Sequence, residues 1–269
     1  MPVRPMQGGG TGTRVVKVLQ NVAEMGEEFT VTALARRLEL APSTVHRLLQ
    51  SLVRTGMIER SGAESYRPGR ELFRMASLLV QRFDVRAMTR PILHELWTQW
   101  QETCSVCLYE SVGRTAKIVD MIASAHPLQY VIASSTTISL AWGSLGRSIL
   151  AFLPDKDINA VIAKAERGPL SGRKALPRAE LLRELDKIRR RGYARFEDRS
   201  TLNIAGIAAP IFGAQGSVLG SMGVTMPLGR FNLCNTKSLT EAILAAASRA
   251  SSALGGDNRR GSIRNSVAK

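Results

Sequence analysis

A chain of 269 residues, 44% of them hydrophobic, is longer than one typical domain and has enough apolar material for two folded domains. Its formal net charge of +15 suits a polyanionic partner such as nucleic acid. Residues 1–90 carry 14 basic and 8 acidic side chains, and residues 91–254 carry 19 and 13. Both parts are therefore equally basic, so charge alone does not locate a nucleic-acid-binding region.

The cysteine content excludes a disulfide-stapled scaffold. Only Cys104, Cys107 and Cys234 occur, an odd number in a long chain, which favours a reducing compartment. No uninterrupted apolar run reaches the roughly eighteen residues of a membrane span, and no secretory signal pattern follows the first residues. We expect a cytoplasmic protein with no membrane contact.

Both ends of the sequence are polar and rich in glycine. Residues 1–12 contain three consecutive glycines and two prolines, and residues 255–269 add four basic side chains. Such segments bury too little apolar surface to order themselves. We expect both to be disordered tails, the second of them basic.

The first folded part has the pattern of three short helices and a hairpin. Apolar residues recur at helical spacing over residues 13–26, and Thr30 is a suitable N-cap for a second helix. A third helix is predicted from Pro42 to Gly56, since proline suits a first helical turn. Turn-prone residues at 61–64 predict a short two-stranded hairpin. This order indicates a winged helix-turn-helix over residues 13–68.

The remainder predicts connecting helices and then an α+β domain. Helical periodicity covers 70–82 and 86–100, and we expect a linker helix over 69–88 between the two domains. Beyond it, over 89–254, the pattern mixes strands with helices. The predicted strands are 105–109, 116–122, 128–133, 204–212 and 217–225, and the predicted helices lie near 144–153, 156–166, 178–191 and 235–254.

The third helix carries hydrogen-bonding side chains on its outer face. With Val45, Leu48, Leu49 and Leu52 turned inward, the outer N-terminal face presents Ser43, Thr44, His46, Arg47 and Gln50. Arginine bonds guanine and glutamine bonds adenine bidentately, so this face suits direct reading of DNA. Five further arginines are placed to meet phosphates: Arg36, Arg37, Arg54, Arg60 and Arg67. Any solvated helix also shows a polar face, and three-helix units also serve as protein-interaction modules.

A family resemblance supports DNA binding. The segment ALARRLELAPSTVHRLLQSLVRTGMIERSGAESYRPG resembles the N-terminal domain of the IclR family of bacterial transcription regulators. The family pattern is filled by Leu34, Ala35, Leu40, Ser43, Thr44, Arg47, Leu48, Leu49, Leu52, Gly56, Tyr66 and Gly69. The resemblance implies a sequence-specific regulator that binds an operator in double-stranded DNA. The default expectation is repression of a catabolic operon, and activation is equally compatible with these residues.

The same resemblance extends into the second half. The family's effector-domain motifs match residues 145–151, 188–193 and 207–211. The resemblance implies a GAF-like domain that binds a small organic acid or aromatic metabolite and helps to form dimers or tetramers. A glycine-bearing loop over residues 143–146, directly ahead of a helix at 147, also suits an anion, because backbone N–H groups can approach it there.

Carried over from the family, the ligand-binding positions fall on two stretches of the chain. They are Ile138, Ser144, Leu145, Glu197, Gly206, Gly223 and Thr225. Gly206 and Gly223 stand where cysteine and serine are common, and Asn203 replaces a usual glycine. We therefore expect a roomier, less polar cavity that accepts an aromatic or larger carboxylate, with Trp142 available to stack on a ring.

An enzyme is the alternative class of function. Residues 142–146 differ by one residue from a G-x-S-x-G nucleophile elbow, because Trp142 stands where the first glycine belongs. A hydrolase would have to use Ser144, with His126 as its base. A lone C-x-x-C at Cys104 and Cys107 would point to opposite faces of a strand, which suits buried packing better than chelation. We expect no catalysis, no metal and no cofactor.

Overall fold

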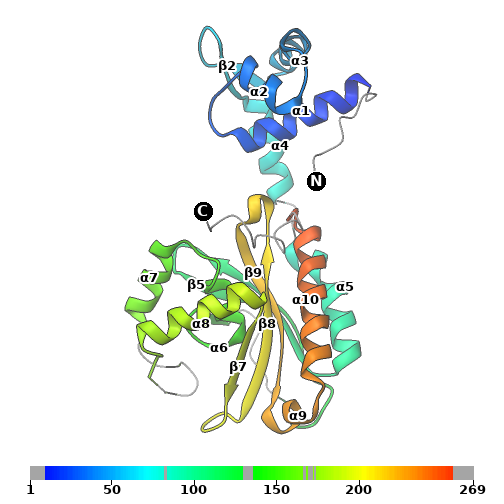
Figure 1. The fold of residues 1–269 in the computed structure, drawn as a ribbon. Helices are drawn as coiled ribbons and strands as arrows, with labels where there is room; N and C mark the ends of the chain where they lie inside the picture. Colours follow the sequence, from blue (N-terminus) through cyan, green and yellow to red (C-terminus); the bar gives the residue numbers. More distant parts are fainter. Residues whose placement is uncertain are drawn as a thin grey trace. The chain divides into compact units, whose positions relative to one another are not determined.

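The computed structural model describes residues 10–81, 84–129, 136–165, 168, 172 and 174–256 (Figure 1). The chain divides between residues 83 and 84 into two compact units. Of the expected tails, residues 1–9 and 257–269 lie outside the described residues. The first helix begins at Thr11, so the expected tail over 1–12 is too long by two residues.

The N-terminal unit contains four helices and a three-stranded sheet in the described residues. They are α1 (Thr11–Met25), β1 (Phe29–Thr30), α2 (Val31–Leu38), α3 (Pro42–Arg54), β2 (Ile58–Arg60), β3 (Ser65–Pro68) and α4 (Arg70–Gln81). The Thr30 hydroxyl accepts from the Ala33 backbone N–H at 3.2 Å, which confirms the predicted N-cap of α2. The strand order is β1-β3-β2. No pattern of residues predicts the two-residue strand β1.

One apolar core holds this unit together. Val18 and Val22 of α1, Leu34 of α2 and Leu49 of α3 are fully buried, because the apolar stripes of the three helices face one another. Phe29 of β1 stands opposite Tyr66 of β3, and their rings stack with centroids 6.2 Å apart; this cluster links the sheet to the helices.

The expected linker helix over 69–88 is two helices in the structure. Helix α4 ends at Gln81, and α5 (Val85–Trp100) begins after Asp84, whose carboxylate accepts from the Ala87 backbone N–H at 3.1 Å. An N-cap marks the start of a new helix. In a continuous helix, the Ala87 N–H would bond the backbone carbonyl oxygen four residues earlier, and here it bonds the Asp84 carboxylate.

The C-terminal unit is built on a six-stranded antiparallel sheet of order β6-β5-β4-β9-β8-β7. Its strands are β4 (Thr103–Glu110), β5 (Thr115–Ile122), β6 (Thr137–Ser139), β7 (Ala194–Asp198), β8 (Ile204–Phe212) and β9 (Val218–Pro227). Its helices are α5, α6 (Gly143–Leu150), α7 (Asp155–Lys164), α8 (Arg178–Arg191), α9 (Leu228–Leu233) and α10 (Thr236–Ala253). A 3₁₀ turn, η1, covers Ala214–Gly216.

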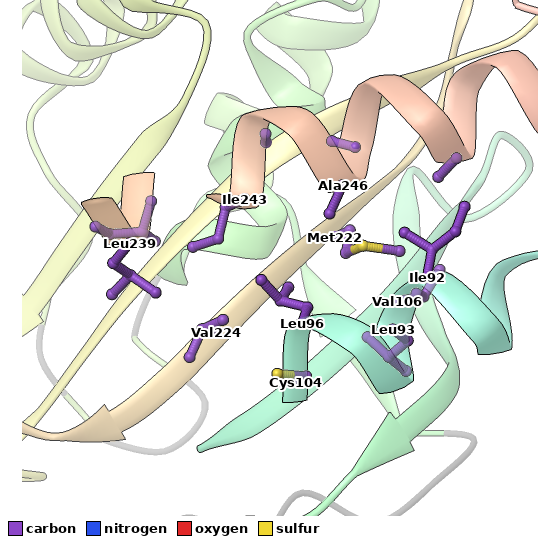
Figure 2. Close-up of a cluster of buried hydrophobic side chains, with 14 of the residues drawn as sticks. Ile92, Leu93, Leu96, Cys104, Val106, Met222, Val224, Leu239, Ile243 and Ala246 are labelled. Carbon is purple, nitrogen blue, oxygen red and sulfur yellow. The ribbon is translucent and has the colours of Figure 1, made fainter. Parts of the chain in front are cut away.

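Helices cover both faces of this sheet (Figure 1). Helices α5 and α10 pack side by side on one face, which we call the α10 face, and Figure 2 shows the cluster that they bury there with β4 and β9. Helices α6, α7 and α8 lie on the other, the α6 face. Cys104 belongs to the first cluster and Cys107 to the second, which confirms that the two thiols point to opposite faces.

Two sequence expectations differ from the structure near the sheet edges. The predicted strand 128–133 falls partly on residues 130–135, which lie outside the described residues, and the described edge strand is β6. Strand β7 was not predicted, because its sequence ARFED lacks an apolar run. Among the described residues, no helix is both long enough and apolar enough to cross a bilayer.

Candidate functional site

The predicted reading helix has the predicted faces. Val45, Leu48, Leu49 and Leu52 are buried, and Pro42 occupies the first turn of α3. On the outer face, Ser43, His46 and Arg47 are exposed. Thr44 and Gln50 are half-buried. The helical period therefore directs all five predicted reading residues away from the core.

Two of these side chains contact each other. The Gln50 Nε2 lies 3.3 Å from the His46 Nε2, one helical turn away. A neutral imidazole nitrogen can accept from an amide, so this contact orients Gln50 on the outer face.

The predicted phosphate-contacting arginines fall into two groups. Arg36 and Arg54 are exposed and make no ion pair with any residue that the structure describes. Arg37 is engaged within the unit, since it donates to the Asn21 Oδ1 at 2.7 Å and to the Glu24 carboxylate. The sequence did not distinguish Arg36 from its neighbour.

The hairpin of β2 and β3 forms the predicted wing. The Arg60 guanidinium carbon lies 5.6 Å from the centre of the Tyr66 ring. Glu59 accepts from Arg67 Nη2 at 3.1 Å and from the Arg70 backbone N–H at 3.0 Å. That backbone hydrogen bond, followed by the bond from Arg67, lowers the pKa of Glu59. Arg67 is thus exposed but already bound to a carboxylate.

A cleft of about 530 Å³ separates α3 from the wing. Ser43 and His46 line one side, and Arg60 and Tyr66 line the other. Thr32, at the start of α2, also lines the cleft, and the sequence carries no signal for this position because Thr32 lies outside the reading helix. The arrangement places hydrogen-bond donors on both sides of a groove that a nucleic-acid backbone could occupy.

The residues expected to form an anion-binding loop are helical. Helix α6 begins at Gly143, with Trp142 at its N-cap position, which agrees with the helix predicted near 144–153, so residues 143–146 form its first turn and not a loop ahead of it. Gly146 allows a close approach, since a Cβ there would lie 2.3 Å from the Ser139 carbonyl oxygen. The glycine therefore serves the packing of α6 against the end of β6, and the first-turn N–H groups belong to residues 143–145.

Most of the predicted ligand-binding residues converge on the α6 face. A Cβ at Gly206 would lie 2.8 Å from the Ser144 Oγ and 3.2 Å from the Thr225 Oγ1, so these three residues are neighbours. Ser144 and Leu145 are buried at the start of α6, and Ile138 packs against the same apolar cluster. We call Ser144, Gly206 and Thr225 the hydroxyl cluster.

The prediction that Gly206 and Gly223 enlarge the cavity is wrong, because other atoms already occupy the space beside both glycines. A Cβ at Gly223 would lie 2.5 Å from the Ile207 carbonyl oxygen and 2.6 Å from the Ala208 Cβ. At Gly206 the hydroxyls of the cluster fill the corresponding volume. Both glycines therefore permit close packing, and neither leaves an empty space the size of a side chain.

Glu197 does not join the hydroxyl cluster. It pairs with Ala205, whose side chain lies on the α10 face, and its carboxylate bonds Arg195 and Arg199. Phe196 is the residue opposite Gly206. Because cross-strand partners share a face of a sheet, β7 directs Phe196, and not Glu197, toward the α6 face.

Neither a metal centre nor a reactive thiol pair is found in the described part of the chain. No group of three His, Cys, Asp or Glu side chains there is placed to hold a metal ion. Burial raises the pKa of Cys104 to about 12 and that of Cys107 to about 11, so both remain protonated thiols at neutral pH. His126, the residue weighed as a base, has its Nε2 3.9 Å from the Glu102 Oε1.

Comparison with known proteins identifies both units. The model of the IclR helix-turn-helix domain matches residues 13–62, and that of the bacterial transcriptional regulator IclR C-terminal domain matches residues 77–252. The regulator BhcR of Paracoccus denitrificans is 26% identical over 87% of this chain and 83% of its own length. The transcriptional repressor IclR of Escherichia coli is 22% identical over 91% of this chain and 89% of its own.

A solved structure shares the fold. An IclR homologue from Microbacterium hydrocarbonoxydans, complexed with 4-hydroxybenzoate, matches with a TM-score of 0.55 and 21% identity over 91% of this chain and 99% of its own. These relatives are named as regulators, which places the chain among DNA-binding transcription regulators and not among hydrolases. The chain belongs to the IclR family of bacterial transcriptional regulators.

Proposed function

We propose that this regulator reads a specific operator with α3 and its wing, and that a small organic acid or aromatic metabolite bound in the C-terminal unit changes its affinity for that operator. The observation that carries the proposal is the row of outward side chains on α3, from Ser43 to Gln50, beside the cleft of the wing. Such a row combines base-reading groups with phosphate-binding groups on one surface.

The DNA-binding surface that we propose contains both kinds of contact. Arg47 and Gln50 read base edges, with His46 orienting Gln50. The exposed Arg36 and Arg54 neutralise phosphates. The full set is Arg36, Ser43, Thr44, His46, Arg47, Gln50, Arg54 and Arg67, of which Arg67 contributes least because Glu59 already binds it.

The ligand site that we propose lies on the α6 face. Ser144 and Thr225 offer hydroxyls, and the first-turn N–H groups of α6 favour an anion. Ile138, Trp142, Leu145, Gly206 and Gly223 complete its surroundings, with Phe196 in place of Glu197. The 4-hydroxybenzoate complex of a homologue with the same fold supports a small aromatic acid as ligand.

We propose that the protein represses a catabolic operon. The E. coli relative that is named as a transcriptional repressor supports this sign of regulation.

A dimer, or a dimer of dimers, would place two copies of α3 on a pseudopalindromic operator. Ligand then shifts the operator-binding equilibrium only by its differential affinity for the free and DNA-bound forms. We propose that residues 13–68 bind DNA, that residues 69–88, which contain α4 and the start of α5, link the two functions, and that residues 89–254 bind ligand.

A gel shift with the promoter beside the protein's own gene tests operator reading. We expect the wild-type chain to bind this fragment in the presence of excess unrelated DNA and Arg47→Ala to lose that preference. Equal, weak binding of both proteins to every sequence would contradict a specific reader.

A thermal-shift screen of aromatic and aliphatic acids tests sensing. A compound that binds the folded state raises the midpoint of unfolding, and a sensor returns it chemically unchanged. The stabilising acid should also change operator affinity in the gel shift. Conversion of the compound to product would instead support the hydrolase alternative at Ser144.

A further inference from the structure

Asp120 of β5 is a buried carboxylate that joins the sheet to the first turns of α5. The residue is only 2% exposed. Its Oδ1 accepts from the Arg90 Nη1 at 2.6 Å and lies 3.4 Å from the Arg86 Nε. The two arginines are one helical turn apart, so both reach the carboxylate from the same side of α5. We call Asp120, Arg86 and Arg90 the α5 anchor, because they hold the part of α5 that directly follows the N-terminal unit in the chain.

A β-bulge turns Asp120 toward α5. Asp120 pairs with Val106 of β4. Cys107, the next residue of β4, pairs with Ile118, so Val119 has no partner on that strand. Val119 packs in the apolar cluster of the α10 face, and Asp120 contacts α5 on the same face, although consecutive residues of a regular strand alternate. Bulges re-aim side chains in this way. The direction of the Asp120 carboxylate therefore depends on how β5 pairs with β4 at this point.

The second oxygen of the Asp120 carboxylate is unused. Oδ1 also accepts from the Met121 backbone N–H at 2.9 Å, whereas Oδ2 is buried and has no hydrogen-bond partner in the described part of the chain. A buried acceptor without a partner costs free energy. A guanidinium fork in its strongest geometry bonds both oxygens of a carboxylate. A small shift of α5 that brings a second nitrogen onto Oδ2 would therefore be stabilised, which gives the α5 anchor two arrangements.

On the other side of β4, buried polar contacts lead to the start of α6. Ser221 of β9 pairs with Cys107, and its Oγ lies 3.0 Å from the Cys107 Sγ. The Ser221 hydroxyl donates to the Leu145 carbonyl oxygen at 3.0 Å. Because a hydroxyl has one hydrogen, the Cys107 thiol is the donor to Ser221, and burial keeps that thiol protonated by raising its pKa to about 11. The contacts therefore run without a gap from the first turn of α6 to the strand position beside the bulge.

We propose that these contacts couple the two faces of the sheet, so that a small acid bound at the first turn of α6 changes the position of α5. The change passes from Leu145 through Ser221 and Cys107 to the bulge. Asp120 is then the positioning residue that sets the first turns of α5. The proposal rests on the proposed function, which places Leu145 in the ligand site. Coupling between two sites needs an element with two arrangements, and the unused Oδ2 gives the α5 anchor that property.

Amide hydrogen exchange in the full chain tests the coupling without operator or acid. Ser221→Ala removes the hydroxyl that joins Cys107 to Leu145, and it does so on the face of the sheet opposite to α5. We expect exchange at residues 88–90 to become about two- to tenfold faster, the range for loss of one hydrogen bond, with exchange in α10 unchanged. An unchanged rate at 88–90, or an equal rise in α10, would overturn the coupling.

Ser148→Ala is the matched control. The Ser148 hydroxyl also donates to the Leu145 carbonyl oxygen, at 2.9 Å, and this serine is as fully buried as Ser221, but its contact lies within α6. Exchange in α5 should therefore keep its wild-type rate in this variant. A rise as large as in Ser221→Ala would show that any loss at Leu145 loosens α5, and it would overturn the assigned route.

A double variant tests the role of Asp120. Asp120→Asn should by itself speed exchange at residues 88–90, and Ser221→Ala should add nothing to it, because the route ends at the α5 anchor. Additive effects would show two independent local losses and overturn the coupling. If Asp120→Asn does not fold, Arg86→Gln combined with Arg90→Gln replaces it, since both arginine side chains are partly exposed.

The acid-dependent part of the test uses 4-hydroxybenzoate, the compound bound by a homologue. In the wild-type chain we expect it to slow exchange at the starts of α6 and α5, and in Ser221→Ala to slow it at α6 alone. Equal protection of α5 in both proteins would overturn the coupling and leave the proposed ligand site intact. Should the acid protect neither helix, the proposed site fails for this acid, and the acid-free comparison still decides the coupling.

Discussion

Gln50 and His46 lie one helical turn apart on the outer face of α3, with the Gln50 Nε2 3.3 Å from the His46 Nε2. The contact restricts a side chain that would otherwise rotate freely, so less entropy is lost when it bonds a base. Arg36 and Arg54, by contrast, have no partner among the described side chains. Base reading and phosphate binding should therefore respond differently to substitution.

Gln50→Ala should relax the choice of sequence. A bidentate contact with a base discriminates by about 1–3 kcal/mol, so the ratio of operator to mismatched-site affinity should fall roughly 5–150-fold, with non-specific binding little changed. Competition binding against operators altered one base pair at a time measures this. An equal loss of affinity for all sequences would mean that Gln50 does not read a base.

Arg36→Ala and Arg37→Ala should behave differently although the residues are neighbours on α2. Arg36 is free to neutralise a phosphate, so its loss should reduce the slope of log K against log salt concentration by about 1. Arg37 is bound to Glu24 and Asn21, so its loss should leave that slope unchanged. Filter binding from 50 to about 200 mM salt covers the needed range. The reverse order of effects would show that Arg37 leaves its partners on DNA.

The sequence predicts a residue's position in a binding site well only where that position depends on the residues next to it in the chain. The faces of α3 follow from a period that a single helix sets by itself, and so Ser43 to Gln50 were predicted correctly as outward residues. Glu197 was misplaced because strand faces depend on pairing. The register of β7 against β8 puts Phe196 opposite Gly206, and one residue of shift exchanges the two faces.

Long-range packing explains the other differences. The sequence predicts extra cavity space at Gly223, but the backbone of Ile207 and the methyl group of Ala208 occupy that space, and this close approach depends on the pairing of β8 with β9. The sequence shows no sign that Arg147 is buried, because its surroundings come from β7, forty-seven or more residues later in the sequence, and from α8. A charge on a helix is ordinarily solvated, so sequence alone would not select it.

Gly223→Ala should destabilise the C-terminal unit. The added Cβ would meet a carbonyl oxygen at 2.5 Å and a methyl group at 2.6 Å, neither of which can rotate away. Overpacking of this kind costs about 1–3 kcal/mol of unfolding free energy. Urea denaturation followed by circular dichroism measures the change.

Gly206→Ala offers a matched comparison. Its nearest contact is the rotatable Ser144 hydroxyl, so the cost should be smaller than at Gly223, and Ser144→Ala should reduce it further in the double variant. The same urea titrations provide this double-mutant cycle. Equal costs at the two glycines, with no coupling to Ser144, would contradict the packing described for the hydroxyl cluster.

Leu79→Glu should weaken the proposed dimer. Helix α4 exposes Leu79 at 67%, with the exposed Met75 and Leu78 on the same side of the helix, and an exposed apolar helix face is typical of an interface. Sedimentation equilibrium should show a larger fraction of monomer. Val112→Glu is the control, since that residue is 98% exposed in a turn of the other unit. An unchanged mass for Leu79→Glu would exclude α4 from the interface.

Only one of the three cysteines should react readily with a thiol reagent in the native protein. Burial raises the pKa of Cys104 to about 12 and of Cys107 to about 11, so at pH 8 roughly one in ten thousand and one in a thousand of these groups are thiolates. Burial also raises the pKa of Cys234, but this thiol is only half-buried.

Ellman's reagent at pH 8 should therefore modify Cys234 first, and all three thiols should react in denaturant. Because the reactive species is the thiolate, raising the pH by one unit should raise the thiolate fraction of Cys107 about tenfold while it remains below its pKa. Cys234→Ser should leave almost no fast reaction. Rapid labelling of that variant would contradict this prediction. It would show that local opening exposes Cys104 or Cys107, which lie in the apolar clusters on opposite faces of the sheet, within the time of the assay.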